Sequence, residues 1–255
     1  MQLLPLFVIV FLLALILISV QAGRLIGFRR WARVPKDERG VYPGIEACVF
    51  ALMGLLVAFT FYGAASRFDG RRMLIAQEAN AIGTAYLRVN LLPADTQPQI
   101  REDFRNYLRS RLAVFQKFPD PTAVRTELDR SAKLQRELWQ HAVEASKGAA
   151  LSTQTLLLGA INEMIDITTT RTVAWQAHPP VAVFIMLGLT VVLSSVLAGY
   201  DMSASEVQDW IPIVAFSILL GSLVYVILDY EFPRFGLIRV SHIDQVLVDT
   251  LQKMK

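Results

Sequence analysis

The chain has 255 residues, of which 54% are hydrophobic and 18% are charged, and its mean hydropathy is +0.42. Charged residues make up about a quarter of an ordinary soluble domain, so this composition argues against a soluble enzyme. The single cysteine, Cys48, excludes a disulfide framework, a CxxC redox pair and a zinc site built from several thiolates. The formal charge of +3 falls short of the dense basic face that nucleic-acid binding requires.

Apolar residues gather in four uncharged runs that are long enough to cross a bilayer. A hydrocarbon core of about 30 Å needs roughly 17 to 25 apolar residues in a helix. The runs are Leu3–Val20, Ala47–Ala65, Val181–Ala198 and Ile211–Leu228. The first could instead be a signal peptide, but no basic residue precedes it and it exceeds the usual apolar length of about 7 to 15 residues. The sequence therefore predicts an all-α, polytopic membrane protein with four spans.

These spans define the expected organisation of the chain. We expect spans at 1–23, 47–65, 179–200 and 211–229, a basic loop at 24–46, a helical insert at 66–178, a short acidic loop at 201–210, and an interfacial turn with an amphipathic tail helix at 230–255. The acidic loop holds no Lys or Arg, which indicates that it lies outside and that the insert and tail are cytosolic. The basic loop opposes that orientation, so the orientation of the first span stays open.

The insert is too long for a linker, and prolines divide it into helical lengths. Apolar residues recur at helical spacing in 71–91, 99–118, 122–147 and 155–175, and no alternating strand pattern competes with them. The first of these helices continues from the second span, and the last runs towards the third span. We therefore expect a helical bundle that stands on the membrane.

The second span is patterned in two stripes. One stripe holds small residues, which let helices approach closely in lipid and so predict packing between copies of the chain: Ala47, Ala51, Ala58 and Ala65. The other holds Phe50, Gly54, Val57 and Phe61. In an oligomer the second stripe would face either a central axis, where an apolar ring can gate ions by dewetting, or the surrounding lipid.

Polar candidates lie just beyond the second span. Glu78 and Asn80 stand among unusually small residues, followed by Arg88. Small residues indicate close helix contact, within which polar groups need partners. Glu78 is therefore expected either to pair with an arginine of a neighbouring helix or subunit, or to line an ion path.

A second polar group follows the fourth span. Asp229, Arg234 and Arg239 lie around a proline and a glycine that end the helix and turn the chain. Local ion pairing at the interface explains them, and an anion contact at either arginine is the alternative. The sequence offers no clustered histidines, nucleophile motif or cofactor loop, so we expect neither metal, cofactor nor catalysis.

Two segments resemble the recurrent motifs of the bacterial and plant membrane family called bestrophin-like: Glu78–Arg88 with Leu92 and Pro93, and Leu228–Asp229 through Pro233 and Gly236–Val240. The resemblance extends from about Ala47 to Leu251 and includes the order span, insert, span, span, tail. It implies four spans, a cytosolic helical region and an oligomer. Bestrophins proper are pentameric anion channels whose second helix lines a hydrophobic neck, which by resemblance makes Phe50, Val57 and Phe61 neck candidates.

The sequence departs from bestrophins proper at two places. Its first span is followed by a basic connection, and its tail has no acidic run of the calcium-clasp kind. The leading hypothesis is a homo-oligomeric channel for inorganic anions, embedded in the lipid bilayer of a bacterial inner membrane. The alternative is a membrane sensor or scaffold whose insert binds a ligand or protein, although the tail of about 25 residues is short for an output domain.

Overall fold

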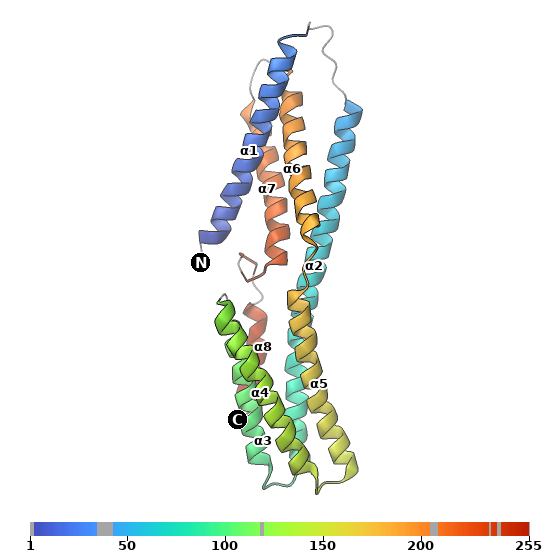
Figure 1. Ribbon diagram of the computed structural model, residues 1–255, viewed down its shortest axis with the longest axis vertical. Helices are drawn as coiled ribbons and strands as arrows, with labels where there is room; N and C mark the ends of the chain where they lie inside the picture. The colour runs from blue at the N-terminus through green and yellow to red at the C-terminus, as the bar shows by residue number, and fades with distance from the viewer. Residues whose placement is uncertain are drawn as a thin grey trace. The chain divides into compact units, whose positions relative to one another are not determined.

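The computed structural model describes residues 3–34, 43–117, 120–204, 209–234, 236–238 and 241–254. These residues form helices and contain no strand, which confirms the all-α prediction. The helices are α1 (Leu3–Trp31), α2 (Pro43–Arg88), α3 (Gln97–Gln116), α4 (Pro121–Ser146), α5 (Leu151–Gln176), α6 (Val181–Met202), α7 (Trp210–Glu231) and α8 (Ser241–Lys253), with a 3-10 turn Val89–Leu91 after α2 (Figure 1).

Four helical stretches have the length and hydropathy of membrane spans. They are Leu4–Arg30, Gly44–Leu91, Leu151–Met202 and Trp210–Glu231. The four apolar runs read from the sequence fall on these stretches, so the prediction of four apolar helices is confirmed. Contacts between helices divide the chain into two compact units, residues 1–68 with 178–238 and residues 69–177 with 239–255.

Helix ends differ from the expected span ends in the first unit. Helix α1 continues to Trp31, so the first part of the predicted loop at 24–46 is helical, because Leu25, Ile26 and Phe28 extend the helix past Arg24. Helix α2 begins at Pro43, before the predicted 47. Residues 35–42, in the middle of this loop, lie outside the described residues.

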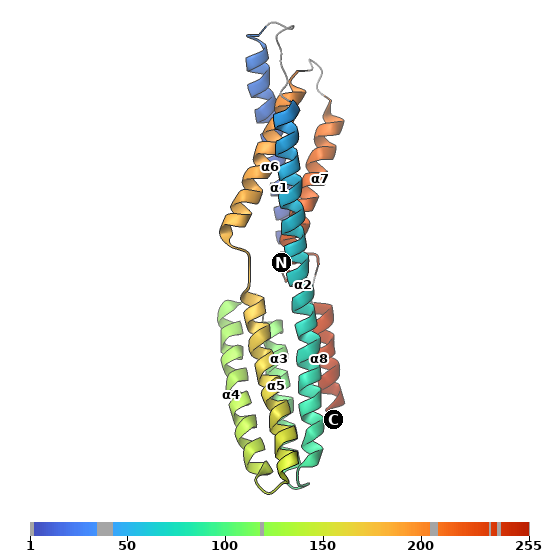
Figure 2. The same cartoon turned by 90° about the vertical axis from the view of Figure 1, so that its right-hand side faces the viewer.

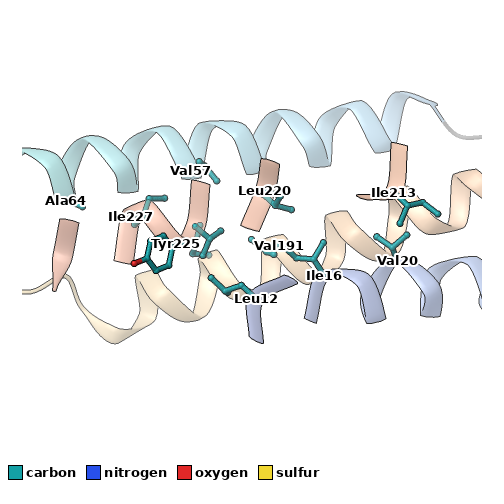
Figure 3. Close-up of a cluster of buried hydrophobic side chains, with 12 residues drawn as sticks. Leu12, Ile16, Val20, Val57, Ala64, Val191, Ile213, Leu220, Tyr225 and Ile227 are labelled. Atoms are coloured by element: carbon teal, nitrogen blue, oxygen red, sulfur yellow. The ribbon is translucent and has the colours of Figure 1, made fainter. Parts of the chain in front are cut away.

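In the first unit, α1 packs closely on α6. A Cβ atom at Gly199 would lie 1.9 Å from the backbone oxygen of Val20, and one at Gly23 would lie 1.9 Å from that of Val196. Only glycine permits backbones to approach so closely. Leu12, Ile16 and Val20 of α1 then meet residues of α6 and α7 in a common apolar core (Figure 3).

In the second unit, α3, α4, α5 and α8 run alongside the latter part of α2 (Figure 2). Prolines start two of these helices: α3 has Pro98 in its first turn, and α4 begins at Pro121. The Asp120 carboxylate caps α4 by accepting hydrogen bonds from the backbone N–H groups of Thr122 and Ala123. The core side chains are fully buried: Phe104, Tyr107, Leu108, Leu138, Leu157, Ile161 and Met164.

The tail helix α8 belongs to this second unit. Its Leu247 is buried, and the backbone oxygen of Met254 accepts hydrogen bonds from the Tyr86 hydroxyl at 3.0 Å and from Nη1 of Arg105 at 3.0 Å. The tail is therefore fixed by apolar burial and by two directed bonds at its C-terminal end.

Candidate functional site

Helix α2 keeps one apolar face open to the outside of the first unit. Large side chains on this face include Tyr62, which is 73% exposed, together with Leu52 and Leu55. Exposed apolar surface of this extent marks a face that lipid, a partner or a ligand covers. The open face is the surface of the unit on which an intersubunit contact or a pathway would be built.

The predicted stripe of Phe50, Gly54, Val57 and Phe61 lies mainly on the opposite side of α2. Val57 is 8% exposed and belongs to the apolar core (Figure 3). The Phe50 ring meets Phe216 of α7 edge-on at 6.3 Å between centroids, and Phe61 meets Tyr230 at 5.8 Å.

This placement argues against Val57 as a pore-facing residue. A side chain held in the core of its own subunit is not available to an axis between subunits. Phe61 is still 40% exposed, and Gly54 is open, with no atom within 4 Å of an added Cβ. Both stripes are apolar, so the sequence did not indicate which one α7 would cover.

The small stripe lies on the open side for most of its length. Ala47, Ala51 and Ala58 are exposed, and Ala65 is half-buried. The alanine that packs into the core is Ala64, which the sequence analysis did not single out. Three of the four small residues therefore stand where a second copy could approach, and that contact stays a prediction.

Glu78 is fully buried between α2, α3 and α5. Its Oε1 accepts a hydrogen bond from Nε of Arg111 at 2.6 Å, and its Oε2 pairs with Nη1 of Arg171. Both arginine side chains are themselves almost completely buried. The two possibilities for Glu78 were pairing or an ion path, and in this structure the carboxylate is engaged by arginines of its own chain.

The other two candidates near Glu78 are placed differently. Arg88 donates from Nη1 to the backbone oxygen of Leu156 at 2.6 Å, which ties the end of α2 to α5. Asn80 is exposed and lines a polar groove of about 640 Å³ between α2 and α5. Glu163 and Asp166 of α5 line the same groove, and Asp166 accepts a hydrogen bond from Asn162 at 2.9 Å.

Asp229 closes the turn that follows α7. Its buried Oδ2 accepts hydrogen bonds from the backbone N–H groups of Leu237 at 3.1 Å and Ile238 at 3.0 Å. A Cβ atom at Gly236 would lie 1.1 Å from Oδ1 of Asp229, so glycine is required there. Arg234 is half-buried beside this turn, and Arg239 lies outside the described residues.

A polar cluster around the buried Glu231, which the sequence analysis did not identify, lies in the first unit. Glu231 at the end of α7 is 1% exposed, and its Oε2 accepts a hydrogen bond from Nε of Arg67 at 2.9 Å and forms an ion pair with Nη2 of Arg67 at 2.7 Å. Nδ1 of His178, just before α6, lies 2.7 Å from the other oxygen of Glu231. These polar side chains stand at the ends of three apolar runs in the sequence, but the sequence does not show that residues so far apart are paired.

A family model described as a bestrophin-like domain matches residues 6–243. The chain belongs to the bestrophin-like family. This confirms the resemblance read from the sequence, and with the four apolar helices it makes the chain an integral membrane protein.

Solved structures of a bacterial bestrophin homologue from Klebsiella pneumoniae share the fold of this bestrophin-like chain. One single-substitution variant is 17% identical, with a TM-score of 0.72, and the match covers 96% of this chain and 98% of that chain. Another is 18% identical, with a TM-score of 0.71 and the same coverage. Among curated proteins, none matches the chain.

The motif residues of the bestrophin-like chain make contacts that hold its helices and one turn in place. Glu78 and Arg88 fasten α2 to its neighbours, and Asp229 with Gly236 builds the turn after α7. Within the described residues, no group of three or more His, Cys, Asp or Glu side chains could hold a metal ion. The candidate functional surface is therefore the open face of α2.

Proposed function

We propose that this bestrophin-like chain is the subunit of an oligomeric ion channel in a bacterial inner membrane, with α2 lining the conduction path. The observation that carries the proposal is the open apolar face of α2, which the other helices of its own unit leave uncovered. Membership of the family supports the same assignment.

The residues on α2 suggest how such a path would be built. Ala47, Ala51 and Ala58 allow the α2 helices of neighbouring copies to approach closely. Leu55 and Tyr62 would then stand beside the axis, where an apolar constriction blocks ions by losing its water. Phe50 and Val57 lie on the other side of α2, where Phe50 contacts α7 and Val57 packs in the core.

Two further features are taken from the resemblance to bestrophins proper. They are the pentameric assembly and the preference for anions such as chloride. Both are measurable: the mass of the assembly in mild detergent gives the number of subunits, and the reversal potential in a potassium chloride gradient gives the sign of the preferred ion.

Flux from liposomes tests the proposal directly. Purified protein should release chloride faster than protein-free liposomes do, and Tyr62→Ala should increase the rate by widening the apolar constriction. Leu189→Ala, at an exposed site on α6, is the matched control and should leave the rate unchanged. Absence of chloride and cation flux above the empty-liposome rate would refute the channel.

The polar groove between α2 and α5 favours a second candidate function, a sensor or scaffold. With a volume of about 640 Å³, it lies within the size range of ligand sites. A soluble ligand or protein partner that binds the insert, and whose binding is lost in Asn80→Trp, would favour this function over conduction.

A further inference from the structure

A second cavity lies within the first unit, between α2, α6 and α7. Its volume is about 320 Å³, which is at the lower end of the range for ligand sites. Apolar side chains and a glycine form most of its wall: Leu56, Phe59 and Gly63 of α2, Val183 and Leu187 of α6, and Ile227 of α7. Arg67 and Glu231 line its one charged end.

The guanidinium of Arg67 lies at the charged end of the cavity. Nε and Nη2 of Arg67 both bind Glu231, and Nη1 has no hydrogen-bond partner among the residues that the structure describes. A Cβ atom at Gly63 would lie 3.2 Å from this Nη1, so the glycine leaves room for the guanidinium beside the cavity. Glu231 is almost fully buried and therefore fixes the orientation of Arg67.

The charged end of the cavity lies where the apolar runs of the helices end, and its apolar part lies along those runs. Arg67 stands where the apolar run of α2 ends, Glu231 where that of α7 ends, and Pro179 just before that of α6. From Arg67 back to Leu56, α2 rises by about 16 Å at the helical rise of about 1.5 Å per residue. This length is close to half of the roughly 30 Å hydrocarbon core, that is, to one leaflet.

We propose that this cavity binds one acyl chain of a phospholipid from the leaflet at the Arg67 end of the α2 span, with a phosphate oxygen accepting a hydrogen bond from Nη1 of Arg67. A phospholipid carries its acceptor oxygens at the interface and an acyl chain that reaches the middle of the bilayer, which matches both the polarity and the length of the cavity. Charged pockets between membrane helices are known to bind lipid head groups.

The head group would be recognised mainly by the fixed direction of the Arg67 N–H group rather than by the net charge of the site. Glu231 neutralises Arg67, so the site offers a fixed N–H group instead of a free positive charge. The planar guanidinium suits phosphate better than a lysine ammonium does. This inference is independent of conduction, because it concerns what occupies a cavity within one subunit.

Native mass spectrometry of the full-length, delipidated protein tests the proposal. The probe is phosphatidylglycerol, compared with diacylglycerol of the same acyl chains and with oleate. Val183→Trp fills the cavity, and Ile185→Trp, at an exposed site on the same helix, is the matched control. We expect phosphatidylglycerol to bind wild type and the control equally, and Val183→Trp about tenfold or more weakly, a loss of at least about 1.4 kcal/mol.

A second variant tests the head-group contact and guards against misfolding of the first. Arg67→Lys keeps a positive charge beside Glu231 but removes the planar fork. It should weaken phosphatidylglycerol binding severalfold and leave diacylglycerol binding unchanged. Unchanged melting temperatures of both variants show that the fold is retained, and if Val183→Trp melts early, Arg67→Lys alone decides the head-group contact.

Three results would overturn the proposal. Equal binding of phosphatidylglycerol to wild type and a folded Val183→Trp would mean that lipid does not enter the cavity. Binding of oleate in place of phosphatidylglycerol would make the occupant a free fatty acid. Loss of the assembly in Val183→Trp, without any change in bound lipid, would mean that a second copy of the chain fills the cavity.

Discussion

Glu78 is held in the interior of the second unit by two guanidinium groups, those of Arg111 and Arg171. The three side chains come from different helices, α2, α3 and α5. A buried pair of this kind adds little stability over apolar residues, but removing one partner leaves an uncompensated charge. At the scale of single residues, this buried cluster links α2, α3 and α5.

The loss of the Glu78 charge tests this role. Glu78→Gln should lower the free energy of unfolding of the second unit by about 3–5 kcal/mol, because two buried guanidinium groups lose the carboxylate charge that they bind. Chemical unfolding in detergent, followed by circular dichroism, measures the change. Glu144→Gln, at an exposed site, is the control and should change the value by less than about 0.5 kcal/mol. Equal effects of the two variants would contradict the structural role of Glu78.

The pH dependence of stability should report on Glu127. The hydrogen bond from Nζ of Lys117, assisted by Arg130 and Ser110, holds the pKa of Glu127 below its ordinary value. A carboxyl whose pKa is lower in the folded state stabilises the fold above its unfolded pKa of about 4.3. That stabilisation is lost as the pH falls through the lower, folded pKa.

Melting temperatures between pH 6 and pH 3 test the assignment to Glu127. The fall in melting temperature on acidification should be smaller in Glu127→Gln than in wild type. Glu137→Gln, on the exposed side of the same helix, should retain the wild-type pH profile. A Glu127→Gln profile that parallels wild type would show that another acid is responsible.

At the scale of elements, the crossing of α1 and α6 depends on glycine. Gly23 and Gly199 each face a backbone oxygen of the other helix, and Gly27 faces the Ser203 side chain. In lipid, helices associate through close van der Waals packing, because burial of apolar surface gives no advantage there. The glycines are therefore a main source of cohesion in the first unit.

A methyl group added at this crossing should lower the stability of the first unit, whereas one added elsewhere on α6 should not. Gly199→Ala should destabilise the first unit by about 1–3 kcal/mol, since its Cβ would overlap the backbone at Val20. Gly188→Ala, where nothing lies within 4 Å, should be neutral or stabilising by up to about 1 kcal/mol through helix propensity. Denaturation by a graded mixture of detergents measures both. Equal tolerance of the two substitutions would mean that the helices cross at a larger distance.

For the whole molecule, each unit has its own core, and α2 contributes to both. The apolar unit leaves the Ala47–Ala58 side of α2 open, while its other side packs on α7. The exposed alanines on this side of α2 would let a further copy of the chain pack closely in lipid.

Disulfide cross-linking tests that assembly. In a Cys48→Ser background, Ala58→Cys should form dimers between copies on oxidation, because a disulfide requires Cα atoms within about 7 Å. Val57→Cys, one residue away but buried in the core, should form none. The absence of dimers from Ala58→Cys, and from Ala51→Cys as well, would mean that copies do not meet along the small stripe.

The sequence by itself determined the elements and the family. Uncharged apolar runs can only be accommodated by lipid or a dry core, so they indicated four apolar helices. Prolines and helical periodicity indicated the helices of the insert, because proline cannot continue a helix from the preceding turn. The motifs around Glu78 and Asp229 identified the bestrophin-like family.

Only the tertiary structure decided which faces and which charges meet. Periodicity defines the stripes on α2, but both stripes are apolar, so the sequence does not show which of them another helix covers. In the structure, α7 packs on the side of α2 that carries Val57. Arg67 and Glu231 are 164 residues apart in the chain, and Glu78 and Arg171 are 93 apart. Pairing over such distances depends on how the helices cross, which no local pattern specifies.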